Sequence, residues 1–166
     1  MPLLRFDLIE GRSESDVKKI LDVTHDVLIE TLQVPKRDGY QVVHEHKESR
    51  IIVEKNTGLG FVRSDHVLLL QVTSRPRSRE MKEKFYRVLV ERLATRRGIS
   101  SDAVIVNFVT NADEDWSFGA GRAQFLTGEL SIERTRRLAT RRETSDAKAS
   151  AVAESPATLS GSYLDS

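Results

Sequence analysis

The sequence predicts an α/β (α+β) fold built from two tandem β-α-β units. Two parts of the chain match at a constant offset of 65 residues: Pro2-Leu3-Leu4 matches Val67-Leu68-Leu69, and Gly11-Arg12-Ser13 matches Pro76-Arg77-Ser78. In each part an apolar run typical of a strand precedes a segment with helical spacing. Strands joined through a helix form a right-handed crossover unit, so two units predict a four-stranded sheet with both helices on one face.

The first unit, about residues 2–62, begins with an apolar strand from Leu3 to Ile9. Ser13 is a suitable N-cap for the helix that follows, and apolar residues recur at helical spacing as far as Thr31. Pro35 cannot continue that helix. We expect a strand over 40–46 and a shorter strand over 51–54.

The second unit, about residues 66–130, repeats this order. We expect a strand over 66–73, a helix capped by Ser78 and ended by Gly98, and a strand over 103–109. With both helices on one face, the opposite face of the sheet is expected to be apolar and bare. Another subunit would then have to cover it.

Composition narrows the classes of function. The net charge of +1 gives no electrostatic argument for nucleic-acid binding, and the absence of cysteine excludes disulfides, thiol nucleophiles and cysteine metal sites. No apolar stretch approaches the roughly 20 residues of a membrane span, and no secretory signal is visible. We therefore expect a cytoplasmic protein with one domain over 2–130. Residues 131–166 form an extension that is expected to be largely disordered, because residues 144–166 are rich in Ser, Ala and Thr.

Pro2 is the first candidate catalytic residue. Removal of Met1 would leave a chain that starts with a free secondary amine. An α-amine has an unperturbed pKa near 8, so it can act as an acid or a base near neutral pH, and a secondary amine can also form an iminium with a carbonyl compound.

Other candidates lie in turns and in a segment outside the repeat. Arg75 and Arg77 follow a predicted strand, and Asp38 precedes Gly39 in a turn. A solvated basic turn and a local turn residue are the alternative interpretations. Aromatic residues and glycines gather in 115–128. His44 and His46 share one face of a strand and could bind a metal, but no third ligand is evident, which favours a structural role.

Several of these segments together resemble the tautomerase superfamily, and most closely malonate semialdehyde decarboxylase and its relatives. The segments are Pro2, residues 9–13, 40–46, 74–78 and 115–119. The resemblance covers residues 2–130. It implies a homotrimer with a site near each Pro2, a small carboxylate substrate, and neither a metal nor an organic cofactor.

The same resemblance assigns roles to individual residues. Pro2 would be the catalytic amine and Asp38 its polar assistant, while Arg75 and Arg77 would bind the substrate carboxylate. An apolar wall would be formed by Trp116, Phe118, Phe125 and Leu126.

Three functional hypotheses follow. The first is decarboxylation of a small 3-oxo acid, malonate semialdehyde, to acetaldehyde and CO2. The second is a tautomerase, a hydratase or a chloroacrylate-type dehalogenase that acts on 2-oxo or unsaturated acids. The third is a binding protein on the same scaffold, with an idle amine. Whether Pro2 acts as a general acid or through an iminium is open at this stage.

Overall fold

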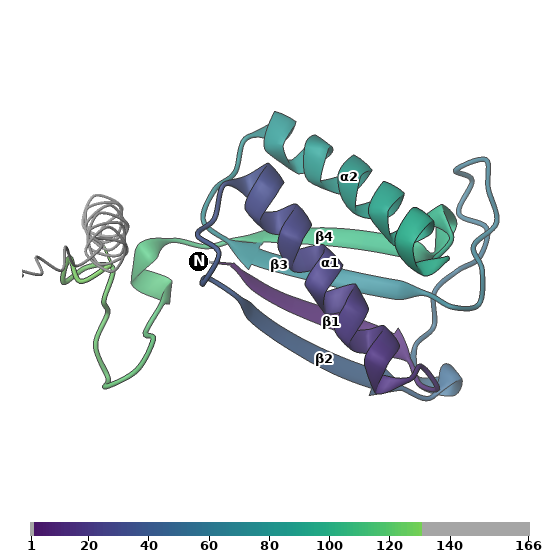
Figure 1. Cartoon of the computed structure of the whole chain (residues 1–166), viewed down its shortest axis with the longest axis horizontal. Coiled ribbons are helices and arrows are strands. Elements are labelled where there is room, and N and C mark those ends of the chain that lie inside the picture. Colours follow the sequence, from purple (N-terminus) through teal and green to yellow (C-terminus); the bar gives the residue numbers. More distant parts are fainter. Residues whose placement is uncertain (1, 131–166) are drawn as a thin grey trace, which may run out of the picture. The chain divides into compact units, whose positions relative to one another are not determined.

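The computed structural model in Figure 1 describes residues 2–130. The elements, in chain order, are β1 (Leu3–Ile9), α1 (Glu14–Leu32), β2 (Tyr40–His46), η1 (Glu48–Arg50), β3 (Leu68–Ser74), α2 (Arg79–Arg97), η2 (Ser101–Ala103), β4 (Val104–Thr110) and η3 (Asp113–Asp115). The chain divides into two compact units, Met1–Ala112 and a second that starts at Asp113. The predicted extension, 131–166, lies outside the described residues.

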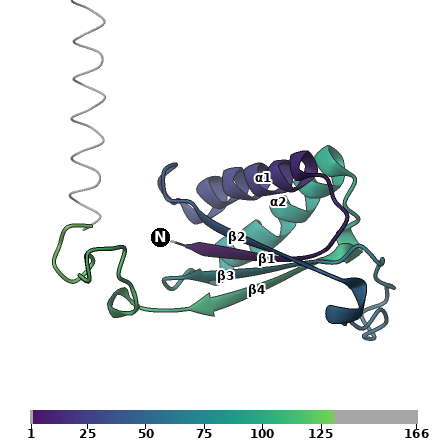
Figure 2. The same ribbon diagram turned by 90° about the horizontal axis from the view of Figure 1, so that it is seen from below.

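The sheet is four-stranded and mixed, in the order β2-β1-β3-β4. β1 pairs parallel with β2, β3 pairs parallel with β4, and β1 and β3 run antiparallel in the middle. Both helices cover one face of the sheet, as Figure 2 shows. The predicted tandem β-α-β architecture is therefore confirmed.

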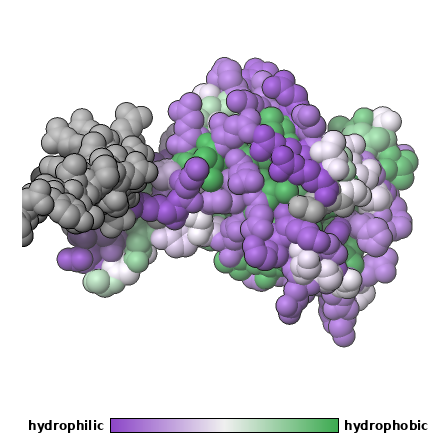
Figure 3. Space-filling view, in the orientation of Figure 1, coloured by the Kyte–Doolittle hydropathy of each residue, from purple (hydrophilic) through white to green (hydrophobic). Residues whose placement is uncertain are grey.

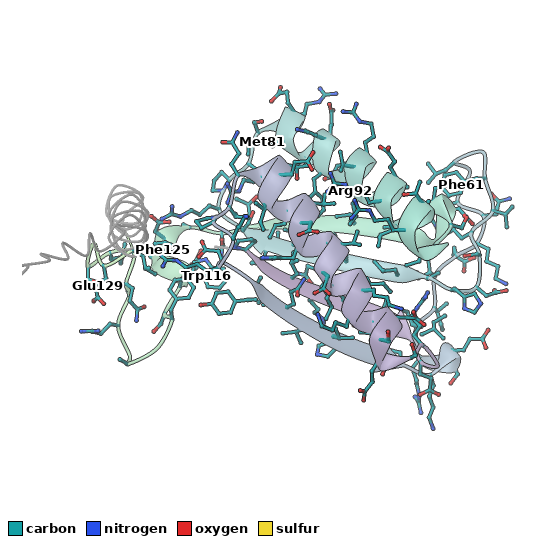
Figure 4. The ribbon with its side chains drawn as sticks, in the orientation of Figure 1. Phe61, Met81, Arg92, Trp116, Phe125 and Glu129 are labelled. Carbon is teal, nitrogen blue, oxygen red and sulfur yellow. The ribbon has the colours of Figure 1, made fainter. Side chains whose placement is uncertain are left out.

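The core lies between the sheet and the helices. β1 and β3 each direct alternate apolar side chains to the helices, and Phe6, Leu70 and Phe85 are fully buried there. Such alternation is what one buried face of a sheet requires. Between the two helices, Arg92 of α2 forms an ion pair with Glu30 of α1, and Figure 4 shows Arg92 between them.

The helix ends match the sequence predictions. The side chains of Ser13 and Ser78 accept hydrogen bonds from the backbone N–H groups of Asp16 and Met81, respectively. Each helix ends in a left-handed residue, Gln33 after α1 and Gly98 after α2. The N-caps of the two helices are thus 65 residues apart, and so are their left-handed C-terminal residues, which is the offset of the repeat.

The helix-free face of the sheet differs from the prediction, because polar groups occupy its centre. Asp7 accepts hydrogen bonds from Arg5 at 3.1 and 3.2 Å and lies 2.7 Å from Nε2 of His46. Burial alone would raise the pKa of Asp7, but the hydrogen bonds from Arg5 and His46 outweigh it and lower the pKa. These groups satisfy one another, so the face need not be uniformly apolar.

Apolar side chains are nevertheless exposed on this face. Tyr40, Val42 and Val109 are 41%, 42% and 38% exposed. The face therefore combines a polar centre with exposed apolar positions on both outer strands.

The strand predicted over 51–54 is wrong. The structure has η1 followed by an irregular loop, and Ile52 is 86% exposed. The apolar run Ile51-Ile52-Val53 has no neighbouring strand to pair with among the described residues, and a short unpaired strand has no stability of its own. Leu59, Phe61 and Val62 are also exposed in this loop, and Figure 3 shows apolar residues at that end of the first unit.

Neither helix in residues 2–130 has the length and apolar character needed to cross a membrane.

The matched helix ends generate a stability prediction. An L-residue in the left-handed region costs about 1–2 kcal/mol, which glycine avoids at some entropic cost. Gln33→Gly should therefore raise the free energy of unfolding by about 0.5 kcal/mol, and Gly98→Gln should lower it by about 1 kcal/mol. Urea denaturation at a fixed protein concentration measures both. Changes of the same sign in the two variants would contradict the role of these caps.

Candidate functional site

Pro2 directly precedes the central strand β1. It therefore lies at the edge of the sheet where β1 and β2 begin and β3 ends. The first pairs of β1 join Leu3 to Tyr40 of β2 and to Thr73 of β3. Continuing both registers by one residue places Pro2 between Gly39 and Ser74. Pro2 is buried, and the loss of an amide hydrogen at the first position before a strand costs nothing in the ladder.

Asp38 reaches this edge from the turn before β2. Its backbone N–H donates to the Pro35 carbonyl at 2.9 Å, which closes the turn. Burial raises the pKa of the half-buried Asp38 carboxyl, and the positive charges of the chain N-terminus and Arg37 act against that shift. The register of β1 and β2 places Gly39 beside Pro2, so Asp38 is the residue directly before the neighbour of Pro2.

Arg75 and Arg77 reach the same edge from the other side, directly after β3. Nη1 of Arg77 donates to the Leu32 carbonyl at the end of α1, at 3.0 Å. This bond places a cation at the negative end of the helix dipole. Burial, and then the charge of Arg75, lower the pKa of Arg77, although a guanidinium remains protonated at neutral pH. The two guanidinium groups therefore lie near each other.

Backbone and hydroxyl groups that sequence reasoning missed support these arginines. Ser74 is buried, and its hydroxyl donates to the Arg75 carbonyl at 2.9 Å. The carbonyl of Ser74 accepts a hydrogen bond from the backbone N–H of Asn111 at 3.0 Å, just beyond β4. The sequence signal that could have pointed to Ser74 is its position, as a polar residue that follows the mostly apolar run 67–72.

The predicted apolar wall belongs to the second unit. The rings of Trp116 and Phe118 stack with centroids 5.3 Å apart, and Phe118 meets Phe125 edge-to-face at 5.3 Å. Figure 4 labels Trp116 and Phe125 on this segment. Leu126, by contrast, is 62% exposed.

Gln124 holds the backbone around this aromatic cluster, and its only signal in the sequence was a polar residue between Ala123 and Phe125. Its Oε1 accepts from the Phe118 N–H at 2.9 Å, and its Nε2 donates to the Gly119 carbonyl at 2.7 Å. Two hydrogen bonds from one buried amide fix the segment around the rings.

The described residues contain no group of three His, Cys, Asp or Glu side chains suited to a metal ion. His44 and His46 lie instead near Asp7 on the helix-free face, and His46 makes the closer contact. A groove of about 330 Å³ beside Arg12, Val17 and Val43 lies at the opposite end of β1 from Pro2. Two basic and two acidic side chains line it, so its charge selects no single class of substrate.

Comparisons with known proteins identify the family of this chain. Two family models described as tautomerase enzyme match residues 2–57 and 38–119. "Probable tautomerase YrdN" of Bacillus subtilis (strain 168) is 57% identical over 130 residues, which cover 78% of this chain and all of that protein.

Two solved structures of malonate semialdehyde decarboxylase are also similar. One, described with decarboxylase and hydratase activities, is 49% identical with a TM-score of 0.74 and is matched over 78% of this chain and 99% of its own. The other, inhibited by 3-bromopropiolate, is 40% identical with a TM-score of 0.73, and the match covers 78% and 98% of the two chains. The repeat, the buried Pro2 before β1 and these similarities establish that the chain belongs to the tautomerase superfamily of enzymes and resembles malonate semialdehyde decarboxylase within it.

Proposed function

We propose that the protein is a cofactor-independent decarboxylase of a small 3-oxo acid, converting malonate semialdehyde to acetaldehyde and CO2. The observation that carries this proposal is the convergence of Pro2, Asp38, Arg75 and Arg77 on one edge of the sheet. An amine for the carbonyl and a pair of cations for the carboxylate are the groups that this reaction needs. The similarity to two malonate semialdehyde decarboxylases supports the same assignment.

The reaction breaks the bond between the carboxylate carbon and the methylene carbon. The electron pair of that bond moves toward the aldehyde carbonyl, CO2 leaves, and the methylene carbon is then protonated. A cationic Pro2 can stabilise the developing charge by giving a proton to the carbonyl oxygen. Alternatively, Pro2 can form an iminium with the aldehyde, which accepts the electron pair at nitrogen.

Arg75 and Arg77 would orient the carboxylate. The breaking bond must lie parallel to the carbonyl π orbital, and a guanidinium fork can hold a carboxylate in that pose. Nε of Arg77 is buried and donates no hydrogen bond within residues 2–130, so a substrate oxygen would satisfy it. A strong ion pair also stabilises the carboxylate that must disappear, so the arginines serve orientation more than binding strength.

The aromatic cluster of Trp116, Phe118 and Phe125, together with Leu126, would supply the apolar wall that favours neutral CO2 over the anion. Within the second unit, the ring of Phe118 contacts both Trp116 and Phe125.

A second candidate function, hydration or tautomerisation of 2-oxo or unsaturated acids, uses the same amine and arginines. The name of the curated Bacillus relative, "Probable tautomerase", favours this candidate.

We also propose a homotrimer. The exposed Tyr40, Val42 and Val109 on the helix-free face would be covered by neighbouring copies. Sedimentation equilibrium at micromolar concentration should therefore give three times the chain mass. Val42→Asp should weaken the assembly, whereas Lys84→Asp on the exposed side of α2 should not. A stable monomer of the unmodified protein would exclude the trimer.

An NMR assay of the purified protein tests the proposed reaction. The protein should convert malonate semialdehyde to acetaldehyde at a higher rate than it turns over any member of a panel of 2-oxo acids and 3-chloroacrylates. Faster turnover of the 2-oxo acids would establish the second candidate instead. If no acid in the panel reacts, both functions fail.

The matched control for this assay is the same chain with Met1 retained. A retained Met1 places the Pro2 nitrogen in a tertiary amide, which has no basicity and no route to an iminium. This form should be inactive. Full activity in protein that intact mass shows to carry Met1 would remove Pro2 from the mechanism.

Arg77→Lys tests the role of the guanidinium fork. Lysine cannot both donate to the Leu32 carbonyl and present a planar fork to a carboxylate. Loss of one charge-assisted interaction of about 1.5–3 kcal/mol predicts a fall in kcat/KM of about 10- to 100-fold. The control is Arg79→Lys, since exposed Arg79 pairs only with Glu83 among the described residues, and its activity should stay within about twofold. Equal activity of the two variants would place carboxylate binding elsewhere.

A further inference from the structure

The turn that carries Asp38 is held from α1 by a histidine. Nε2 of His25 lies 2.8 Å from the carbonyl oxygen of Lys36. Because a carbonyl can only accept, His25 must carry a proton on Nε2 and donate it. His25 therefore fastens the residue two positions before Asp38 to the middle of the helix.

Gly39 lets the histidine ring come close on the other side of Asp38. A Cβ at position 39 would lie 3.1 Å from Cε1 and 3.3 Å from Nδ1 of His25. Contacts this short require the neighbour to move, and an imidazole ring has little freedom to do so while its Nε2 is bonded. Glycine at this position is thus explained by space rather than by backbone conformation.

A second hydrogen bond from the same helix secures the start of β2. Nε2 of Gln41 donates to the Leu21 carbonyl at 2.9 Å, one helical turn before His25. Together with the bond from the Asp38 N–H to the Pro35 carbonyl, this contact fixes the chain on both sides of Asp38.

We propose that His25 is a positioning residue for Asp38, holding the turn 35–39 so that the carboxylate stays beside the amine of Pro2. The proposal rests on the proposed function, in which Pro2 and Asp38 act together. His25 touches neither the amine nor the substrate in this role. It acts through the backbone of Lys36 and through the space beside Gly39.

The expected consequence lies in the acidity of the amine. A carboxylate near an ammonium group favours the charged form and raises its pKa. Without His25 the turn loosens, Asp38 gains solvent, and its influence on the amine is screened. The pKa of the Pro2 amine should then fall.

The experiment is a pH titration by NMR of protein labelled with ¹⁵N-proline and processed to a free Pro2 amine. Asp38→Asn should lower the pKa of the amine by about one unit or more, and His25→Ala should lower it by about half as much. His25→Gln retains an N–H donor at the position of Nε2 and should restore most of the difference. His66→Ala, which changes an exposed histidine at the opposite end of the sheet, should leave the pKa unchanged.

The space beside Gly39 provides an independent arm of the test. Gly39→Ala should also lower the pKa of the amine, because its Cβ displaces the His25 ring. In the His25→Ala background the same change should add little, since the ring it would meet is gone. These variants carry the test if His25→Ala fails to fold.

The outcomes separate this inference from the proposed function. If Asp38→Asn lowers the pKa of the amine and neither His25→Ala nor Gly39→Ala does, His25 is not a positioning residue. If Asp38→Asn itself has no effect, the inference is also overturned. A response of the amine to His25 in a protein that turns over no acid in the substrate panel would support the inference while the proposed function fails.

Discussion

The position of β1 in the middle of the sheet is the constraint on which the rest of the structure depends. This strand follows directly on Pro2 and pairs on both sides, with β2 and with β3. A chain end is ordinarily mobile, but strand pairing on both sides ties this one down. Its two neighbours then determine what surrounds the N-terminal residue: the turn before β2 brings Asp38, and the turn after β3 brings Arg75 and Arg77.

The internal repeat explains why one edge of the sheet, and not both, carries these groups. Under the offset of 65 residues, Arg77 corresponds to Arg12, Pro2 to Val67 and Asp38 to Ala103. Val67 and Ala103 are buried apolar residues within the chain. The opposite edge therefore keeps an arginine but has neither a terminal amine nor a carboxylate at the corresponding positions. The two repeats share a backbone fold, but they differ in the side chains that could take part in a reaction.

Local signals predicted most of the fold because the structure satisfies them locally. The caps Ser13 and Ser78, the end of the second helix at Gly98 and the strand Leu3–Ile9 depend on neighbouring residues and on one buried face. The prediction failed where the outcome depends on distant partners. Residues 51–54 are β-branched and apolar up to Val53 but pair with no strand, and Asp7 on the helix-free face contacts His46, which is distant in sequence.

The candidate site divides in the same way. The sequence was enough to identify the candidate residues and to place three of them in turns. The strand registers then bring all four to one edge of the sheet: Pro2, Asp38, Arg75 and Arg77. The contacts that orient them could not, because a carbonyl such as that of Leu32 or Lys36 carries no residue-specific signal. His25 likewise looks like an ordinary helix residue until the turn 35–39 is folded against it.

The charges at this edge are balanced by the topology rather than by any single ion pair. Asp38 and Arg75 each lie one position beyond the residues that flank Pro2, on opposite neighbouring strands. The carboxylate favours the ammonium form of the amine, whereas the two guanidinium groups favour the neutral form. In the proposed mechanism a proton donor and an iminium-forming nucleophile need opposite protonation states of the amine, so the carboxylate and the guanidinium groups favour different routes. Asp38 and the arginines are held by different contacts, because Arg77 donates to the Leu32 carbonyl and the Arg75 carbonyl accepts from the Ser74 hydroxyl. Under the proposed function, the turn at 35–39, held by His25 and by the bond from the Asp38 N–H to the Pro35 carbonyl, is the part of the site that sets the position of Asp38.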